Sequence, residues 1–567
     1  MKLGARVFFA AGLVALLLAS IAVAAFAPSG EDFRISNAGA DGDTDIVSAA
    51  PDVAFNATAN EYLAVWDDNR EETTEEEFEV WGQRLGASGN QVGSDFPISD
   101  VGDEDGEGFD AVVAHNPEDD EYLVVWSADA LATDGEFEIW GQRLDGDGSK
   151  LGGNFRISNV GADTVATAEV SDPDVAYSPA ANTYLVAWQG ENAGENDFEI
   201  YGQMVSSAGA EVGSDFPISN VGAGSVRGAF TPAVAFNPAS GEFLVVWEGE
   251  GGVVDEEYEI WGQRVNGAGL EQGVDFQISN MDAPATPDAF AAALTTDPDT
   301  GEMLVVWQSG DPEIDSVEVY GQRLGAAGGE LGKDFKISNA LDFDPGSDAG
   351  AAAVSSSSKS DEYLVAWLSN ATADGHIEVF GQRLGPSGGE LGSDFPISGA
   401  GGAGPGREVS TEDPPNLAHD PAADRFLAVW WADELATDDE FEVFGRLIGE
   451  SADPASTGAG QGGGATTVVK TPPPPRCRGQ VATKFGTTKR DVIIGTAKRD
   501  VIVGLGGKDT LRGLGGNDLL CGGKGKDTLI GGGGKDRLLG EAGKDKLRGG
   551  PGKDLLNGGA GKDDQKQ

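Results

Sequence analysis

Near the C-terminus the chain carries aspartates at a constant spacing, and these are its strongest candidates for chemistry. They fall nine residues apart without a slip, at positions 491, 500, 509, 518, 527, 536, 545, 554 and 563. The surrounding pattern is Gly-Gly-x-Gly-x-Asp-x-Leu-x, complete at 522–530, 531–539 and 549–557. Glycine permits a positive-φ turn that exposes backbone carbonyls. Carboxylates and carbonyls together are hard oxygen ligands, and this chemistry suits Ca²⁺.

Short strands must position these aspartates. An apolar residue stands two places after eight of them, at Ile493, Ile502, Leu511, Leu520, Leu529, Leu538, Leu547 and Leu556. Each glycine turn is therefore followed by a short strand whose Leu or Ile is expected to face inward. Two nonapeptides make one coil, so the aspartates should stack in two columns, each of which takes every second aspartate.

This run, residues 486–563, resembles the repeats-in-toxin, or hemolysin-type calcium-binding, family. The resemblance implies a parallel β-roll with Ca²⁺ between successive turns. It implies a ligand role, shared with turn carbonyls, for Asp509, Asp518, Asp527, Asp536, Asp545, Asp554 and Asp563. Pairing each of these with the aspartate one coil further on gives up to five sites. Asp491 and Asp500 lack the double glycine and are interpreted as a cap.

The residue before each aspartate departs from the family pattern, which usually has Asn or Asp there. Only Asn517 conforms. The other positions hold Arg490, Arg499, Lys508, Lys526, Lys535, Lys544, Lys553 and Lys562. A cation beside each site should weaken Ca²⁺ binding electrostatically. A glycine roll that folds without metal is therefore the alternative interpretation.

Cys477 and Cys521 are the only cysteines, and in an exported chain a disulfide between them is expected. Their separation corresponds to roughly 12 Å along the roll at about 4.8 Å per coil, whereas a disulfide needs Cα atoms within about 7 Å. The bond can therefore form only if 477–485 folds back along the roll.

Residues 31–449 repeat one unit seven times. The segment EYLAVW (61–66) recurs with closing tryptophans at Trp66, Trp126, Trp188, Trp247, Trp307, Trp367 and Trp430. FEVWGQRL (78–85) and DFPIS (95–99) recur equally often, and a weaker motif, PDVAFN (51–56), precedes each EYLVVW-like segment. All four are rich in β-branched and aromatic residues and are bounded by turn residues, which indicates strands. Four strands in each of seven copies predict a seven-bladed β-propeller; a row of separate small sandwiches is the alternative.

The phase of the repeat predicts how the ring closes. The mature chain expected after removal of a leader opens with DFRIS (32–36), a fourth strand, and the last copy stops after FGRLIG (444–449) without one. We expect 32–36 to complete the last blade beside 441–448. The long second-to-third and blade-to-blade loops then fall on one acidic rim, which is the expected ligand face.

One glutamate recurs at the same place in every copy: Glu79, Glu138, Glu199, Glu259, Glu318, Glu378 and Glu442. A catalytic site is asymmetric, so a residue found in every blade is interpreted as structural. Five residues after five of these stand Arg84, Arg143, Arg264, Arg323 and Arg383. They are expected to make ion pairs or backbone hydrogen bonds between blades.

The distribution of charged residues and the N-terminal segment indicate how the chain is divided into domains. The formal net charge is −57, with 84 acidic and 16 basic residues in 28–466 but 11 acidic and 20 basic residues in 467–567. This excess of acid disfavours nucleic acid as a partner. Residues 1–27 have the pattern of a signal peptide, with an uncleaved signal anchor as the alternative. The expected domains are the propeller (28–450), a Gly/Pro-rich linker (451–475) and the calcium-binding roll (476–567).

These observations predict an all-β, secreted or cell-surface-associated, calcium-binding protein with no membrane span after cleavage. Its propeller is interpreted as a non-enzymatic binding or adhesion module for a glycan or protein ligand, and a monomer is expected. Two alternatives stay open. One is an extracellular polysaccharide-active enzyme with its site on the long-loop face, and the other is a calcium-dependent surface structural protein.

Overall fold

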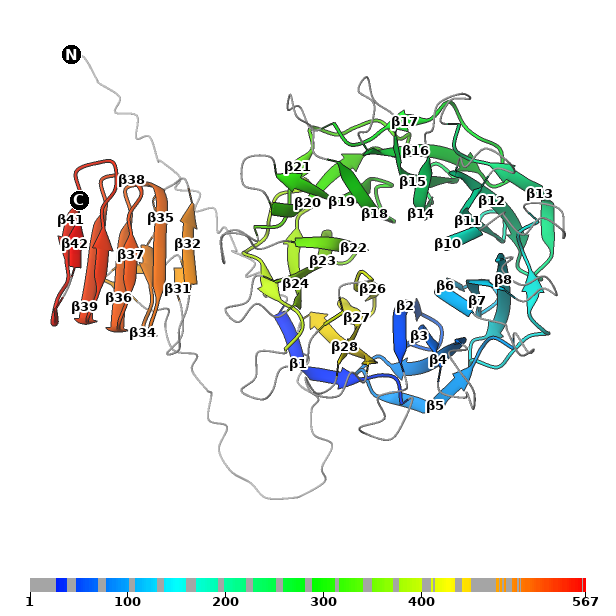
Figure 1. Cartoon of the computed structure of the whole chain (residues 1–567), viewed down its shortest axis with the longest axis horizontal. Coiled ribbons are helices and arrows are strands. Elements are labelled where there is room, and N and C mark those ends of the chain that lie inside the picture. The colour runs from blue at the N-terminus through cyan, green and yellow to red at the C-terminus, as the bar shows by residue number, and fades with distance from the viewer. Residues whose placement is uncertain are drawn as a thin grey trace, which may run out of the picture. The chain divides into compact units, whose positions relative to one another are not determined.

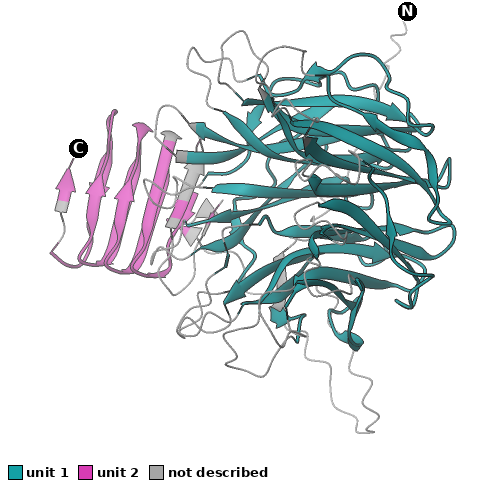
Figure 2. Cartoon of the chain, turned by 45° about the vertical axis from the view of Figure 1, so that its right-hand side comes forward, with its two compact units in different colours: residues 1–453 teal, residues 454–567 magenta. Residues whose placement is uncertain are grey.

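The computed structural model forms two compact units, residues 1–453 and 454–567 (Figure 2), which are described separately. It describes residues 27–37, 47–69, 78–100, 108–129, 137–159, 170–191, 198–220, 228–250, 258–280, 288–311, 316–339, 349–370, 377–399, 409–410, 413–433, 441–449, 476–478, 480–481, 484–485, 492–496, 499, 501–562 and 564–566. These residues form strands and turns and no helix, so none of them lies in a helix that could cross a membrane. Residues 1–26 of the expected signal peptide (1–27) lie outside them, and Ala27 is described as the first residue of a strand.

Seven four-stranded antiparallel sheets surround a central channel in the first unit (Figure 1), which confirms the seven-bladed propeller. The first strands of the blades are β2 (Ser48–Asn56), β6 (Gly108–Asn116), β10 (Val170–Ser178), β14 (Ala229–Asn237), β18 (Ala289–Thr296), β22 (Ala349–Ser357) and β26 (Asn416–Asp420). The second strands are β3 (Glu61–Asp68), β7 (Glu121–Ala128), β11 (Thr183–Glu191), β15 (Glu242–Glu250), β19 (Met303–Asp311), β23 (Glu362–Ser369) and β27 (Arg425–Asp433).

The outer half of each blade holds the remaining two strands. The third strands are β4 (Glu79–Gly86), β8 (Glu138–Asp145), β12 (Phe198–Ser206), β16 (Tyr258–Asn266), β20 (Ser316–Leu324), β24 (Glu378–Leu384) and β28 (Phe441–Gly449). The fourth strands are β5 (Gln91–Pro97), β9 (Phe155–Arg156), β13 (Glu211–Pro217), β17 (Phe276–Gln277), β21 (Phe335–Lys336), β25 (Phe395–Pro396) and β1 (Ala27–Arg34).

The second strands form the core because neighbouring blades cover both of their faces. One apolar cluster joins Leu63 and Val65 of β3 to Tyr122, Val124 and Trp126 of the next blade. All five side chains are at most 1% exposed. A strand that is buried on both faces does not need to alternate polar and apolar residues, which explains the continuous YLVVW-like runs.

The seventh blade is closed by the N-terminal strand, as the repeat phase predicted. β1 pairs antiparallel with β28, and Phe33 lies opposite Gly445 and Arg34 opposite Phe444. The Ile35 N–H donates to the Val443 carbonyl at 2.7 Å, and the Ile35 side chain is fully buried. The seam therefore joins the two ends of the repeat array by strand pairing and by core packing.

The recurring glutamates have one structural role in all seven blades. The Ser99 hydroxyl donates to Glu79, and its oxygen accepts the Val80 N–H at 2.7 Å, so these two residues tie the third strand to the segment that follows the fourth. The same serine-to-glutamate bond joins Ser158 to Glu138, Ser219 to Glu199, Ser279 to Glu259, Ser338 to Glu318, Ser398 to Glu378 and Ser36 to Glu442. A contact repeated in every blade serves the fold.

The recurring arginines have a different acidic partner from the glutamate five residues earlier. Arg84 pairs at 2.6 Å with Glu61, the first residue of the adjacent strand in the same blade. Arg84 also donates to the Asp147 carbonyl of the next blade at 2.9 Å, which is the expected kind of inter-blade hydrogen bond. Equivalent ion pairs join Arg143 to Glu121, Arg264 to Glu242, Arg323 to Glu302 and Arg383 to Glu362.

Both members of this ion pair are replaced together in the other two blades. The third blade has Thr183 and Met204 at the two positions, and the seventh has Arg425 and Leu447. No blade keeps one charge of the pair and loses its partner. This pattern indicates that a blade tolerates the complete ion pair or its complete replacement, because one charge left without its partner would destabilise the blade.

Two parallel sheets stacked from successive coils make up the second unit (Figure 1), which confirms the parallel β-roll. One sheet contains β31 (Lys484–Phe485), β33 (Val501–Val503), β36 (Leu519–Gly525), β39 (Arg537–Gly543) and β41 (Leu555–Asn557), with β34 (Gly506–Gly507) beside β36. The other contains β32 (Val492–Thr496), β35 (Thr510–Gly516), β37 (Thr528–Ile530), β40 (Lys546–Arg548) and β42 (Asp564–Lys566), with β38 (Gly533–Gly534) beside β35.

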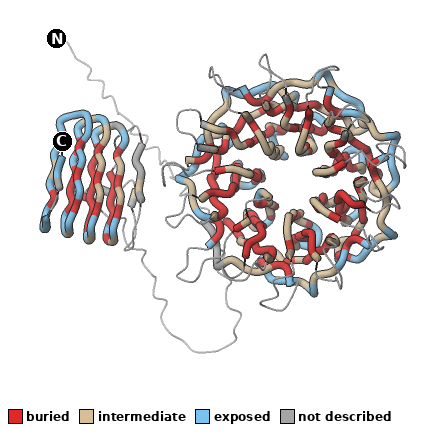
Figure 3. The backbone as a smooth tube through the Cα atoms, in the orientation of Figure 1, coloured by how far each residue is buried: buried red, intermediate tan, exposed pale blue. Residues whose placement is uncertain are grey.

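The strands of the roll pair in a register of two nonapeptides per coil. Leu511 lies opposite Leu529, and Leu529 opposite Leu547. The side chains two places after the aspartates form the inner core, and those of Ile502, Leu511, Leu520, Leu529, Leu538 and Leu547 are at most 1% exposed. Figure 3 shows buried segments along the strands of the roll. This is the inward-facing column that the nonapeptide pattern predicted.

A short hairpin lies against the outer face of the first sheet. β29 (Arg476–Cys477) pairs antiparallel with β30 (Gln480–Val481), and Cys477 forms a disulfide with Cys521 across a Cα–Cα distance of 5.9 Å. Cys477 packs with Val503 and Leu519, whose side chains face away from the inner core. The chain before the roll therefore folds back along it, which removes the distance that would otherwise separate the two cysteines.

Replacing Arg383 by Met should destabilise the propeller by about 3–5 kcal/mol, because Glu362 would stay buried without its cation. The double variant Glu362→Thr/Arg383→Met copies the third blade and should recover a large part of this loss. All 11 tryptophans lie in the propeller sequence, so urea unfolding followed by tryptophan fluorescence measures this unit. A double variant as unstable as the sum of the two single variants would contradict the coupling.

Candidate calcium sites and the propeller channel

Six of the seven candidate ligands lie in two buried columns of the roll. Asp509, Asp518, Asp527, Asp536 and Asp545 are 1% exposed, and Asp554 is 8% exposed. Asp563 lies outside the described residues, as do Asp491 and Asp500, which were interpreted as a cap. One column runs through 509, 527 and 545, and the other through 518, 536 and 554, because each coil takes two nonapeptides.

Each carboxylate spans two coils through one of its oxygens. Asp527 Oδ1 accepts the Asp509 N–H at 2.9 Å, and Asp545 Oδ1 accepts the Asp527 N–H at 3.0 Å. In the other column, Asp536 Oδ1 accepts from Asp518 N–H and Asp554 Oδ1 from Asp536 N–H, at 2.9 and 3.0 Å. These bonds pair each aspartate with its equivalent in the next coil, in four of the five pairings that the sequence implies.

The second carboxylate oxygen faces a glycine and a carbonyl of the next coil. Asp527 Oδ2 and Asp536 Oδ2 are buried and accept no hydrogen bond. A Cβ atom on Gly522 would lie 2.8 Å from Asp527 Oδ2 and 3.0 Å from the Gly540 carbonyl oxygen. The same arrangement joins Gly531, Asp536 Oδ2 and the Gly549 carbonyl, at 2.5 and 2.7 Å. Two oxygens of different coils therefore converge on a space that only glycine leaves open.

This donor set fits a hard cation. Among the described residues, no three His, Cys, Asp or Glu side chains converge as they would in a metal site made of side chains alone. The oxygens that converge are one carboxylate and backbone carbonyls, which are the donors that Ca²⁺ accepts. Burial is the largest influence on the Asp527 and Asp536 carboxylates and raises the pKa of both, and Asp545 and Asp554 raise these pKa values further. A bound divalent cation would place a positive charge beside these buried carboxylates and would favour their ionised form.

The residue before each of the six described aspartates is exposed, and asparagine and lysine at this position differ in what they can donate or accept. The Asn517 Oδ1 accepts the Lys535 N–H of the next coil at 2.9 Å, so an asparagine here adds a bond between coils. A lysine ammonium has no acceptor and cannot make that bond. This side-chain hydrogen bond between coils therefore cannot form at Lys508, Lys526 and Lys544. Each of these lysines instead places a cation beside the aspartate that follows it.

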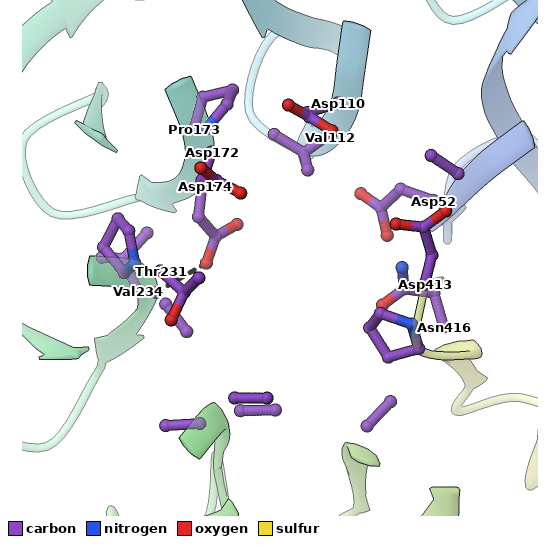
Figure 4. Close-up of a pocket in the computed structure, with 18 of the residues that line it drawn as sticks. Asp52, Asp110, Val112, Asp172, Pro173, Asp174, Thr231, Val234, Asp413 and Asn416 are labelled. Atoms are coloured by element: carbon purple, nitrogen blue, oxygen red, sulfur yellow. Dashed lines mark hydrogen bonds between the residues drawn. The ribbon is translucent and has the colours of Figure 1, made fainter. Parts of the chain in front are cut away.

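The propeller has a separate cavity of about 430 Å³ at one end of its channel (Figure 4). It lies beside the first halves of the first strands. The carboxylates of Asp52, Asp110, Asp172, Asp174 and Asp413 lie around it. The blades opposite supply the short side chains of 291–293 and 352–353, all alanine, so the cavity is acidic on one side and apolar on the other.

A bulge that is repeated in the first strands shapes this cavity. Six first strands contain a non-glycine residue with φ between 46° and 57°, namely Ala50, Asp110, Asp172, Thr231, Ala291 and Ala351. Bulges of this kind redirect side chains and recur near functional sites. Two of the six bulge residues are aspartates that line the cavity.

The acidic residues of the cavity are not shared by all blades. Asp52 and Asp174 hold the position that Ala233, Ala293 and Ala353 hold in other blades. Each bridges to the next blade, since Asp52 Oδ2 accepts the Val113 N–H at 2.8 Å and Asp174 Oδ2 accepts the Val234 N–H at 2.6 Å. Sequence reasoning missed this group because it lies in the weakest of the four motifs. The departure from alanine within that motif is the signal that could have found it.

Burial and mutual repulsion hold protons on these carboxylates. Burial raises the pKa of Asp52 to about 6 and that of Asp174 to about 7. The pKa of Asp110 also rises to about 7, chiefly through burial and then through repulsion from Asp172 and Asp413. Carboxyl groups that titrate near neutral pH can donate or accept a proton there.

Comparison with known proteins identifies the C-terminal repeats. Residues 485–520, 494–529, 519–547 and 530–564 each match the family model of the RTX calcium-binding nonapeptide repeat. No curated protein matches the chain. The match supports Ca²⁺ as the ion that the repeats bind.

Solved structures match the chain only at low sequence identity. An α-L-arabinofuranosidase from Fusarium graminearum is 13% identical with a TM-score of 0.43, covering 64% of this chain and 99% of that one. A polysaccharide lyase is 11% identical with a TM-score of 0.43, covering 70% and 89%. A Hadza microbial sialidase is 9% identical with a TM-score of 0.39, covering 73% and 68%.

The raised pKa values predict a pH-dependent stability of the propeller. Between about pH 4 and pH 7 the native state binds protons at Asp52, Asp110 and Asp174 that the unfolded chain has already lost. These groups therefore lower the free energy of unfolding as pH rises through this range. Substituting all three by Asn should remove their part of this slope, measured by urea unfolding with tryptophan fluorescence at intervals from pH 4 to pH 7. Identical slopes in the variant and the unaltered chain would contradict the assignment.

Proposed function

We propose that this chain is a secreted protein whose C-terminal roll binds Ca²⁺ and is stabilised by it. The observation that supports this most directly is the buried carboxylate oxygen of Asp527 and Asp536, which faces a carbonyl of the next coil beside a glycine. The ligand set proposed is Asp509, Asp518, Asp527, Asp536, Asp545, Asp554 and Asp563 with the turn carbonyls. Metal binding of this kind couples to folding, because the donors come together only when the coils stack.

The compartment follows from the same chemistry. Millimolar Ca²⁺ outside the cell would fill sites that adjacent lysines have weakened. The Cys477–Cys521 disulfide belongs in an oxidising environment. Together with the leader pattern of residues 1–27, these features favour a secreted or cell-surface location. The corresponding domain order is leader, propeller (28–450), linker (451–475) and roll (476–567).

The propeller is proposed as the ligand-binding module, with its site at the cavity in the channel. The cavity combines carboxylates, which accept hydrogen bonds from sugar hydroxyls or from amines, with an apolar wall of alanines. Its residues differ between blades, whereas the contacts that hold the blades are repeated. A glycan or a protein segment on this face fits an adhesion role without catalysis.

The alternative is an enzyme that acts on polysaccharide at the same cavity. The asymmetry of the carboxylates favours it, as do the pKa values of about 6 for Asp52 and about 7 for Asp174, because acid–base catalysis at neutral pH needs groups that titrate there. A calcium-dependent surface structural protein is the third possibility, and ordered self-assembly upon addition of Ca²⁺ would identify it.

Calcium binding is tested on the full chain by Asp527→Asn. Asp527 belongs to two of the stacked pairs, so the substitution should weaken binding at both by more than about 10-fold, measured by isothermal titration calorimetry. The control is Asp361→Asn, an exposed propeller residue with φ of 55°, a conformation that Asn tolerates. Far-ultraviolet circular dichroism should change on addition of EDTA. An unaltered chain that takes up no Ca²⁺ at millimolar concentration would refute the proposal.

The binding and enzymatic roles are separated by Asp174→Ala together with Asp52→Ala. Three other blades have alanine at this position, so the propeller should keep its fold. A binding module retains a glycan on an array without producing new reducing ends or unsaturated products, and the variant binds more weakly. Product release by the unaltered chain that is lost in the variant would instead assign an enzyme.

A further inference from the structure

The lysines that precede the buried aspartates form a row along one edge of the roll. Parallel pairing places equivalent residues of successive coils side by side, as Thr510, Thr528 and Lys546 show. Lys508, Lys526, Lys544 and Lys562 therefore occupy the same place in four successive coils, and all four are exposed. Neighbouring strands are about 4.8 Å apart, so the row repeats at that distance.

A second, shorter row follows the opposite edge. Lys535 and Lys553 precede the aspartates of the other column, in line with Asn517. Both lysines are exposed. The two edges of the roll thus each carry cations at the coil spacing, and the first edge does so without a gap.

These ammonium groups are not used within the roll. The structure shows no ion pair between the six lysines and any residue that it describes, and the carboxylates beside them are turned inward. Like charges in register on adjacent strands repel each other and destabilise the sheet. A row that costs stability and makes no internal contact is suited to an external partner of opposite charge.

The composition of this surface selects among polyanions. Residues 501–562 contain no Phe, Tyr or Trp. Proteins that hold single-stranded nucleic acid stack its bases on aromatic side chains, and this surface has none to offer. A linear acidic polysaccharide has no bases to stack and carries its negative charges along one extended chain. The charge pattern fits such a polymer lying along the edge.

We propose that the row of Lys508, Lys526, Lys544 and Lys562 binds a linear acidic polysaccharide that lies along the axis of the roll. The inference rests on the proposed function in one respect: Ca²⁺ assembles the row by stabilising the stacked coils. The two ligands also couple directly. The polymer neutralises cations that weaken the metal sites, so each ligand raises the affinity for the other.

The test uses the full chain and immobilised chondroitin sulfate, a linear polymer of alternating uronate and sulfated sugar, with dextran as the neutral control and duplex DNA as a second polyanion. Lys526→Gln/Lys544→Gln removes two members of the row. The matched control, Lys524→Gln/Arg537→Gln, removes two exposed cations of the same roll that have no charged neighbour one coil away.

The row variant should bind chondroitin sulfate at least about 10-fold more weakly at low salt. Its affinity should also depend less on salt, because two fewer cations release counterions from the polymer. The control should change by less than about 2-fold. An equal loss of affinity in the two variants would show that binding depends only on the net charge of the roll, and it would overturn the proposal. Duplex DNA bound as tightly as the polysaccharide would overturn the assignment of the partner.

Isothermal titration calorimetry with Ca²⁺ on the same proteins distinguishes the proposal of calcium binding from the proposal of polysaccharide binding. The row variant should bind Ca²⁺ more tightly than the unaltered chain, because cations beside the carboxylates are gone. Normal Ca²⁺ binding without retention of the polymer would refute the row and leave the calcium proposal standing. Retention that persists in EDTA, with no Ca²⁺ uptake, would refute the calcium proposal and the coupling to Ca²⁺, and would leave only the binding of the polymer by the row.

Discussion

The repeat of two nonapeptides per coil is the constraint on which the roll depends. It stacks equivalent positions of successive coils, so the leucines of the inner core lie on leucines, and the aspartates of each column lie on aspartates. The lysines that precede these aspartates fall in line in the same way. The turns can stack this closely only where glycine stands, since a Cβ on Gly525 would overlap the Gly507 carbonyl oxygen. One geometric rule thus produces a dry core, two columns of buried carboxylates and a row of surface cations.

In the propeller, residues that recur in every blade hold the fold, whereas residues found in only some blades line the cavity. The bond between Ser99 and Glu79 recurs in every blade and holds the third strand to the chain beyond the fourth. Asp52 and Asp174 occupy one position of the repeat in only two blades, and three other blades have alanine there. The fold therefore does not require these carboxylates, although they bridge blades, and their retention in a cavity with raised pKa values is consistent with a role in binding.

The position before each aspartate illustrates a balance between metal affinity and surface charge. Asn517 bridges two coils through the Lys535 N–H, and the lysines at the equivalent positions forgo that bond. Lysine here weakens the adjacent metal site and loads the edge with positive charge. A roll selected only for tight Ca²⁺ binding would hold asparagine throughout. The lysines are better explained if the edge itself has a partner.

The sequence by itself determined the strands and their number, because the strict nonapeptide period and the seven-fold recurrence of four motifs leave few ways to stack strands. The phase of the repeat also required 32–36 to close the ring. The sequence also indicated the aspartate columns and the inward leucines. It did not reveal the true partner of Arg84, because Glu61 and Arg84 meet only across adjacent strands. Nor did it reveal the acidic cavity, since Asp52, Asp110 and Asp174 belong to three different blades and meet only once the blades close around an axis. Local periodicity fixes what pairs with its neighbour, whereas the curvature of the closed ring decides which distant side chains share one space.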